Sequence, residues 1–150
     1  MRCPACKTGD TAVIDSRDSD EACSIRRRRE CVTCNYRFTT YERLEVPNLM
    51  VVKKSGAREI FDRGKLARGI YKAFEKRNVE QDKIEDLIDG VVREIMEKYD
   101  SEIQSTVIGE ITLERIKKID KVAYIRFASV YREFVDLVAF QEEIKKLISR

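Results

Sequence analysis

The chain has 150 residues, of which 43% are hydrophobic and 38% are charged, and its formal net charge is +3. This composition excludes a disordered protein, and no apolar run reaches the roughly 18 residues that a transmembrane helix needs. Because the N-terminus also lacks the apolar core of a signal peptide, we expect a cytoplasmic protein. Its cysteines are then expected to serve as metal ligands rather than disulfides, with one of the five left over.

Two cysteine pairs organise the beginning of the chain. Cys3 and Cys6 form one CxxC motif, and Cys31 and Cys34 form a second. Short β-prone segments surround the pairs, and a core this small commonly depends on a bound metal. Four thiolates suit one structural Zn²⁺ per chain in a tetrahedral shell, although iron uses the same ligand set. The fifth cysteine, Cys23, has no partner at ligand spacing and is interpreted as a small apolar side chain.

Arginines are dense between and after the cysteine pairs. From residue 22 to residue 43 there are six arginines and two glutamates. Neighbouring side chains of a strand project to opposite faces, so at most two of the four consecutive arginines address one surface. Arginine binds phosphate and guanine through paired hydrogen bonds, which favours contact with double-stranded DNA, while the alternative is a solvated strand that balances a four-thiolate zinc site. The predicted DNA contacts are Arg17, Arg26, Arg27, Arg28, Arg29 and Arg37.

A linker at residues 45–48 and a β-hairpin at residues 49–61 come next. Asp62 is expected to cap the first of four helices. The fourth helix is apolar over nearly its whole circumference, so it is either central to a helical bundle or shared with another chain. The helices are predicted at residues 63–77, 81–99, 105–119 and 121–140.

Basic residues gather at the start of the second domain. Residues 53–77 hold nine Lys or Arg and three acids, whereas residues 78–120 hold six and twelve. Lys65 lies in the first helical turn, where the helix dipole disfavours a cation unless an anion binds nearby. The pattern indicates a polyphosphate site, with an ordinary solvated basic face as the alternative. The side chains concerned are Lys53, Lys54, Arg58, Lys65, Arg68, Lys72 and Lys76.

Residues typical of catalysis are missing. The chain has no histidine, no glycine-rich phosphate loop and no serine or cysteine nucleophile beside a base. We therefore expect no enzymatic activity, and a bound nucleotide would be sensed rather than hydrolysed.

Five segments together match a known family. They are CPAC at 3–6, VIDSR at 13–17, SIRRRREC at 24–31, RFTTYE at 37–42 and DKVAYIRFASVYREF at 120–134. These segments closely resemble the bacterial ribonucleotide reductase repressor family, NrdR, and the resemblance spans essentially the whole chain. It implies an α+β architecture in three parts. The parts are a rubredoxin-like zinc ribbon at 1–46, a mainly helical ATP-cone with an N-terminal β-hairpin at 49–139, and a C-terminal helical extension at 140–150.

The resemblance also implies a function. Members bind ATP or dATP in the ATP-cone, change oligomeric state and repress reductase genes through the ribbon. The expected partners are therefore operator DNA, ATP or dATP, and further copies of the chain. The resemblance implies nucleotide binding by Val51, Lys53, Lys54, Glu59 and Lys65. The basic stripe adds Arg68 and Lys72, and the fourth helix adds Tyr124 and Tyr131 as aromatic faces for adenine.

Two other classes of protein share these features. One is an RNA-binding zinc ribbon with a helical dimerisation domain, and the other is a detached allosteric subunit of an enzyme. Binding to a specific duplex rather than to RNA separates the first from a repressor. Co-purification with a reductase would support the second.

Overall fold

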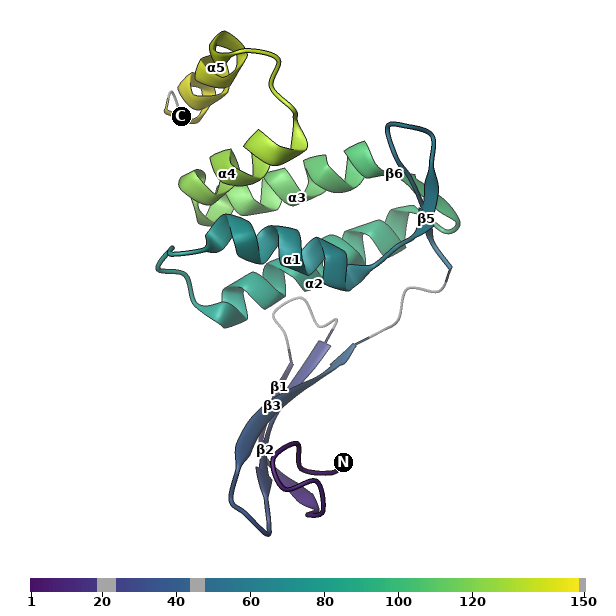
Figure 1. Ribbon diagram of the computed structural model, residues 1–150, viewed down its shortest axis with the longest axis vertical. Coiled ribbons are helices and arrows are strands. Elements are labelled where there is room, and N and C mark those ends of the chain that lie inside the picture. Colours follow the sequence, from purple (N-terminus) through teal and green to yellow (C-terminus); the bar gives the residue numbers. More distant parts are fainter. Residues whose placement is uncertain (19–23, 44–47, 149–150) are drawn as a thin grey trace. The chain divides into compact units, whose positions relative to one another are not determined.

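The computed structural model describes residues 1–18, 24–43 and 48–148, and it contains two compact units (Figure 1). The predicted α+β class is confirmed, with five helices and two three-stranded sheets in these described ranges. None of the helices described is long and apolar enough to cross a membrane. Cys23 and most of the predicted linker at 45–48 lie outside the described residues.

The first unit, Met1–Glu45, is an antiparallel sheet with the strand order β1-β2-β3. The strands are β1 (Thr11–Asp18), β2 (Ser24–Cys31) and β3 (Arg37–Arg43). Among the described residues of this unit, Cys3 and Cys31 are the only buried hydrophobic side chains. The core is therefore as thin as the sequence predicts, and burial alone does not account for a stable fold.

The second unit, Val46–Arg150, contains a small sheet and five helices. The predicted hairpin is confirmed as β4 (Met50–Val52) and β5 (Arg58–Ile60), which pair in antiparallel fashion around a turn where Gly56 has a φ of 81°. β4 also pairs in parallel with β6 (Glu102–Gln104), a strand that the sequence did not predict. A three-residue strand with a single apolar side chain leaves no periodicity to detect.

Helices α1 and α3 both pack against α2 and α4, and the core lies between the four (Figure 1). Ile70, Ile88 and Leu113 are fully buried there. The carboxylate of Asp62 accepts the backbone N–H of Lys65 at 3.1 Å, so the predicted cap of α1 is confirmed. The helices are α1 (Arg63–Phe74), α2 (Gln81–Lys98), α3 (Ser105–Ile119), α4 (Lys121–Tyr131) and α5 (Leu137–Ile148).

The predicted fourth helix at 121–140 is wrong, because the structure contains two helices there. α4 ends at Tyr131, and Glu133 then adopts a left-handed φ of 49° that reverses the chain. Asp136 accepts the backbone N–H of Ala139 at 2.8 Å and thereby starts α5. This cap is a single aspartate inside a continuous apolar pattern, so periodicity alone hides the break.

Candidate functional sites

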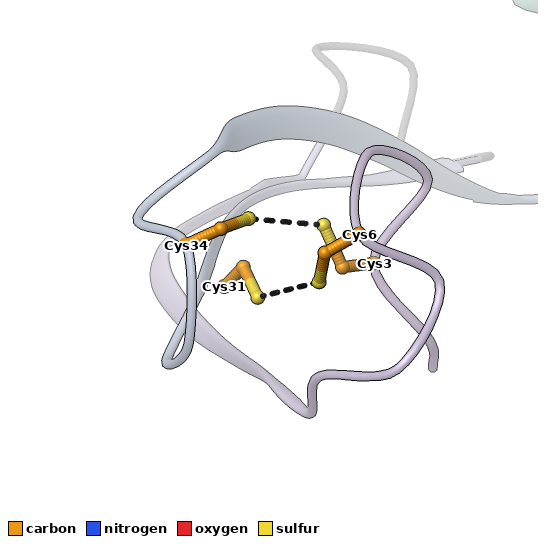
Figure 2. A group of neighbouring side chains, drawn as sticks. All are labelled: Cys3, Cys6, Cys31 and Cys34. Atoms are coloured by element: carbon orange, nitrogen blue, oxygen red, sulfur yellow. Dashed lines mark hydrogen bonds between the residues drawn. The ribbon is translucent and has the colours of Figure 1, made fainter.

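Four thiol groups meet where the two CxxC loops approach each other (Figure 2). The sulfurs of Cys3 and Cys34 are 3.6 Å apart, those of Cys6 and Cys31 are 3.7 Å apart, and all four lie within 4.8 Å of one another. With metal–sulfur bonds of about 2.3 Å, the sulfurs of a tetrahedral zinc site are about 3.8 Å apart. The cluster therefore fits one tetrahedral metal ion, and the sulfurs are too far apart for disulfides.

The two cysteine loops have the same local geometry. Lys7 and Asn35, which follow the two pairs, have φ values of 61° and 56°. Their N–H groups donate to the carbonyls of Cys3 and Cys31 at 2.9 and 3.0 Å. At Gly9 a Cβ would lie 2.7 Å from the Cys31 sulfur, so only glycine allows the loops to approach this closely.

The protonation of the thiols also favours a bound cation. Backbone N–H groups of Thr8 and Gly9 lower the pKa of Cys6 to about 6. The N–H of Tyr36 favours the Cys34 thiolate, but burial and the neighbouring thiols outweigh it and raise the pKa of Cys34 to about 12. Four thiolates therefore coexist here only when a metal ion compensates their charge.

The strand register gathers arginines from all three strands on one face of the first sheet, which we call the arginine face. Arg26 lies opposite Arg17 on β1 and Tyr41 on β3, while Arg28 lies opposite Asp15 and Thr39. Directly opposed residues share a face of the sheet. Alternation along β2 places only two of its four arginines on this face, and the neighbouring strands supply further arginines there. The arginine face comprises Arg17, Arg26, Arg28, Arg37 and Arg43, accompanied by the acids Asp15 and Glu30.

The other two predicted arginines lie on the opposite face and have partners there. Arg27 forms an ion pair with Glu42. Arg29 donates to the hydroxyls of Thr40 and Thr11 at 3.3 and 3.2 Å. Arg43, which the prediction did not include, has its guanidinium 4.1 Å from the ring centroid of Tyr41. Its place on the arginine face depends on the β2–β3 register, which spacing along one strand does not reveal.

The second unit contains a cavity of about 1020 Å³ between the β4–β5 turn, α1, α3 and α4. Cations predominate among its charged side chains, and one part of its wall is apolar and aromatic. A volume of this size accommodates a nucleotide. The cations are Lys53, Lys54, Lys65, Lys72, Lys76 and Arg126, the carboxylates are Glu75 and Glu133, and the apolar part includes Ile108, Phe127, Val130 and Tyr131.

Glu59 organises two of the lysines. Its carboxylate accepts Lys53 at 2.7 Å and Lys65 at 2.8 Å. Hydrogen bonds from Lys53 and Lys65 lower the pKa of Glu59, and the bond to Glu59 raises the pKa of Lys65. This ion pair offsets the unfavourable helix dipole at Lys65, so the position of that lysine alone does not require a bound anion.

The predicted nucleotide-binding residues do not all line the cavity. Val51 is in the core, and Glu59 contacts lining lysines without lining the cavity itself. Arg68 is exposed beside Asp62 on α1. Tyr124 is buried and donates to Glu143, and it lies two helical turns, about 10 Å, along α4 from Tyr131. The predicted residues that line the cavity are Lys53, Lys54, Lys65, Lys72, Lys76 and Tyr131.

Tyr131 forms its part of the wall by lying directly over Gly109 of α3. A Cβ at Gly109 would lie 1.9 Å from the Tyr131 ring. The ring also stacks on Phe127, with centroids 6.1 Å apart, and its hydroxyl donates to the carbonyl of Thr106. The Lys54 ammonium is 5.9 Å from the ring centroid, where a cation interacts favourably with the π-system.

Arg126 is a cavity residue that the sequence reasoning missed. It donates to the backbone carbonyls of Glu75 at 2.5 Å and Ala73 at 3.5 Å, at the end of α1. The available signal was that Arg126 is the only charged residue between Val122 and Tyr131. A lone charge in an apolar helix often marks a polar site, but here it was interpreted only as part of the helix.

Comparison with known proteins relates both units to one family. Residues 1–42 match the family described as "Transcriptional repressor NrdR-like, N-terminal domain", and residues 49–137 match the ATP cone domain. The chain is 53% identical over 150 residues to the transcriptional repressor NrdR of Pelotomaculum thermopropionicum, covering 100% of this chain and 90% of the relative. It is 52% identical to the one from Geobacillus kaustophilus, covering 100% and 98%. The chain belongs to the NrdR family.

NrdR relatives are named transcriptional repressors, which is a non-enzymatic role. The predicted family is therefore confirmed. An NrdR zinc ribbon supports zinc, rather than iron, in the four-thiol cluster. An ATP cone over residues 49–137 supports nucleotide binding in the second unit.

Proposed function

We propose that this chain represses ribonucleotide reductase genes by binding operator DNA through its zinc ribbon, under the control of ATP or dATP bound in the ATP-cone. The observation that carries the proposal is the basic cavity of the second unit, where six cationic side chains adjoin an aromatic wall. Cations and aromatic side chains are the two surfaces that a nucleotide requires, one for its phosphates and one for its base.

In this proposal the phosphates bind the lysines of the β4–β5 turn and α1, and the base stacks on Tyr131. Lys53 and Lys65 are already held together by Glu59, so little side-chain ordering remains for the ligand to induce. Lys54 lies near the Tyr131 ring and connects the two parts of the site. Glu59 orients the lysines rather than contacting the ligand.

The DNA-binding half of the proposal rests on the arginine face. Five arginines and two carboxylates leave a local excess of positive charge on this side of the sheet. Arg28 is exposed, and it has no hydrogen bond or ion pair with another described residue. Such side chains suit phosphate and base contacts, whereas Arg27 and Arg29 are held on the opposite face.

The nucleotide site is tested by Lys65→Ala with Arg68→Ala as the matched control, since both residues lie on α1 but only Lys65 lines the cavity. By isothermal titration calorimetry, Lys65→Ala should weaken ATP and dATP binding together, because the two ligands share their phosphates. Arg68→Ala should bind both as the unaltered chain does. Wild-type affinity in Lys65→Ala, or nucleotide binding that leaves operator affinity unchanged, would contradict the proposal.

Control by nucleotide also requires a change in assembly or conformation, because the chain lacks the residues for hydrolysis. Exposed apolar side chains after the middle of α4 support contacts between copies of the chain. They are Val130, Val135, Leu137, Val138 and Ile148. Light scattering should give different masses with ATP, with dATP and without nucleotide. Identical masses in all three conditions, with unchanged operator affinity, would rule out this form of control.

A further inference from the structure

Helix α5 is held to the rest of the second unit by few contacts. Among its described residues only Glu143 and Leu147 are buried. Glu143 accepts the hydroxyl of Tyr124 and pairs with Arg132 at 2.9 Å, and Lys121 donates to the carbonyl of Leu147 at 2.8 Å. A helix with so little buried apolar surface detaches or unfolds locally at a low cost in free energy.

One of the residues that hold α5 is adjacent in sequence to residues of the cavity. Tyr131 and Glu133 line the cavity, and Arg132 lies between them. Arg132 pairs with Glu143 of α5, while Glu133 pairs with Lys54 of the β4–β5 turn at 3.5 Å. One short turn therefore contributes both to the cavity and to one of the contacts that hold α5.

This turn depends on its contacts for its conformation. Glu133 has a φ of 49°, a left-handed conformation that a residue with a side chain seldom adopts without support from its surroundings. Its carboxylate is one of only two among the described side chains that line the cavity. An anionic ligand would compete with Glu133 for Lys54 and would repel its carboxylate.

We propose that the turn at residues 132–136 is a latch, in which a polyphosphate in the cavity displaces Glu133 from Lys54 and thereby releases α5 from α4. The displaced turn carries Arg132 away from Glu143, so α5 loses its ion pair. Release leaves the Tyr124 hydroxyl and Leu147 open to solvent or to another chain. This inference rests on the proposed function, because it requires that the cavity binds a nucleotide, and it specifies how that site is coupled to the rest of the chain.

Hydrogen exchange on the zinc-loaded full chain tests the latch. With saturating ATP, the backbone amides of α5 should exchange several-fold faster than without ATP, while those of α2 should not change. Glu133→Gln removes the charge of an exposed side chain without altering its size, so the variant should fold. In this variant α5 should exchange fast both with and without ATP. Glu142→Gln, an exposed residue of α5 outside the cavity, should behave as the unaltered chain does.

The outcomes separate this inference from the proposed function. If calorimetry detects no ATP binding to the unaltered chain, the proposed function itself is wrong. If ATP binds and α5 exchange is unchanged or slower, the latch is wrong and nucleotide sensing stands. Wild-type exchange behaviour in Glu133→Gln would also overturn the latch, because Glu133 would then not couple the cavity to α5.

Discussion

At the residue scale, the contacts of an arginine in the first sheet depend on the face of the strand on which it lies. Arg27 and Arg28 are neighbours in sequence, yet Arg28 belongs to the arginine face and Arg27 pairs with Glu42 on the other side. Composition treats the two arginines as equivalent. The strand register makes them different, which allows each to serve as the control for the other.

Arg28→Ala is expected to reduce the salt dependence of operator binding, because it removes one of the proposed phosphate contacts. The slope of log affinity against log salt concentration should fall by about one unit. Arg27→Ala should leave the slope unchanged, since that side chain lies on the side of the sheet opposite the arginine face. Fluorescence anisotropy titrations across a series of salt concentrations measure both slopes, and equal slopes in the two variants would refute the assignment of the face.

Gly109→Ala is expected to displace Tyr131, because the new Cβ would lie 1.9 Å from its ring. Overpacking of this kind costs about 1–3 kcal/mol, and ATP affinity should fall with the loss of the aromatic wall. Gly69 also lines the cavity, so Gly69→Ala is a control for stability alone. Its Cβ would lie 3.7 Å from Phe127 in ordinary contact and should stabilise α1 by about 0.5–1 kcal/mol. Thermal unfolding and calorimetry distinguish the two variants, and equal effects would argue against this role of Gly109.

At the element scale, periodicity predicted α1, α2 and α3 because each buries one continuous apolar stripe. It failed at the break between α4 and α5, where apolar residues continue through a turn that Glu133 and Asp136 create. The four-thiol cluster was predictable from spacing, because both CxxC loops are local. The cavity was predictable only in part. Helix packing brings Arg126 and Gly109 to the cavity, and no local sequence pattern predicts that packing.

Asp120 joins two elements, because it ends α3 and caps α4. Its carboxylate accepts the N–H of Ala123 at 2.8 Å and pairs with Arg77 at 2.9 Å. Burial disfavours the charged form, but these hydrogen bonds outweigh it and lower the pKa of Asp120. A lowered folded-state pKa means that the carboxylate stabilises the fold above its ordinary pKa, and that this contribution is lost as the pH falls through the folded-state pKa.

Asp120→Asn keeps an oxygen for the cap but removes the charge that Arg77 contacts. It should lower the free energy of unfolding by about 1–2 kcal/mol at neutral pH. The difference should begin to shrink below about pH 4, where this aspartate becomes protonated in the unfolded chain, and should be lost as the pH falls through its lowered pKa in the folded chain. Urea denaturation at both pH values measures it, with the exposed Asp100→Asn as control. A difference that does not change with pH would show that the charge contributes nothing.

At the scale of the whole molecule, the two units differ in what stabilises them. The second has a large buried core, whereas the described part of the first buries chiefly two cysteines among its hydrophobic side chains. The metal site therefore supplies much of the folding free energy of the first unit. Loss of the metal should unfold one unit and spare the other.

Cys3→Ser is expected to lose the zinc ion and DNA binding while retaining helical circular dichroism and ATP binding. Elemental analysis should find one zinc per chain in the unaltered protein and almost none in this variant. A chelator should give the same result as the mutation. Cys23→Ser is the control, because Cys23 has no partner at ligand spacing in the sequence, and loss of zinc from that variant would contradict the assignment of the ligands.

The parallel pairing of β4 with β6 constrains the order of events during synthesis. Residue 50 pairs with residue 102, whereas every strand of the first sheet lies within the first 43 residues. A ribosome adds roughly 5–20 residues per second, so β4 waits several seconds for its parallel partner, and α3 and α4, which complete the cavity, emerge later still. The ribbon can thus take up zinc and fold on the ribosome before the cavity exists, so its folding does not wait for the second unit.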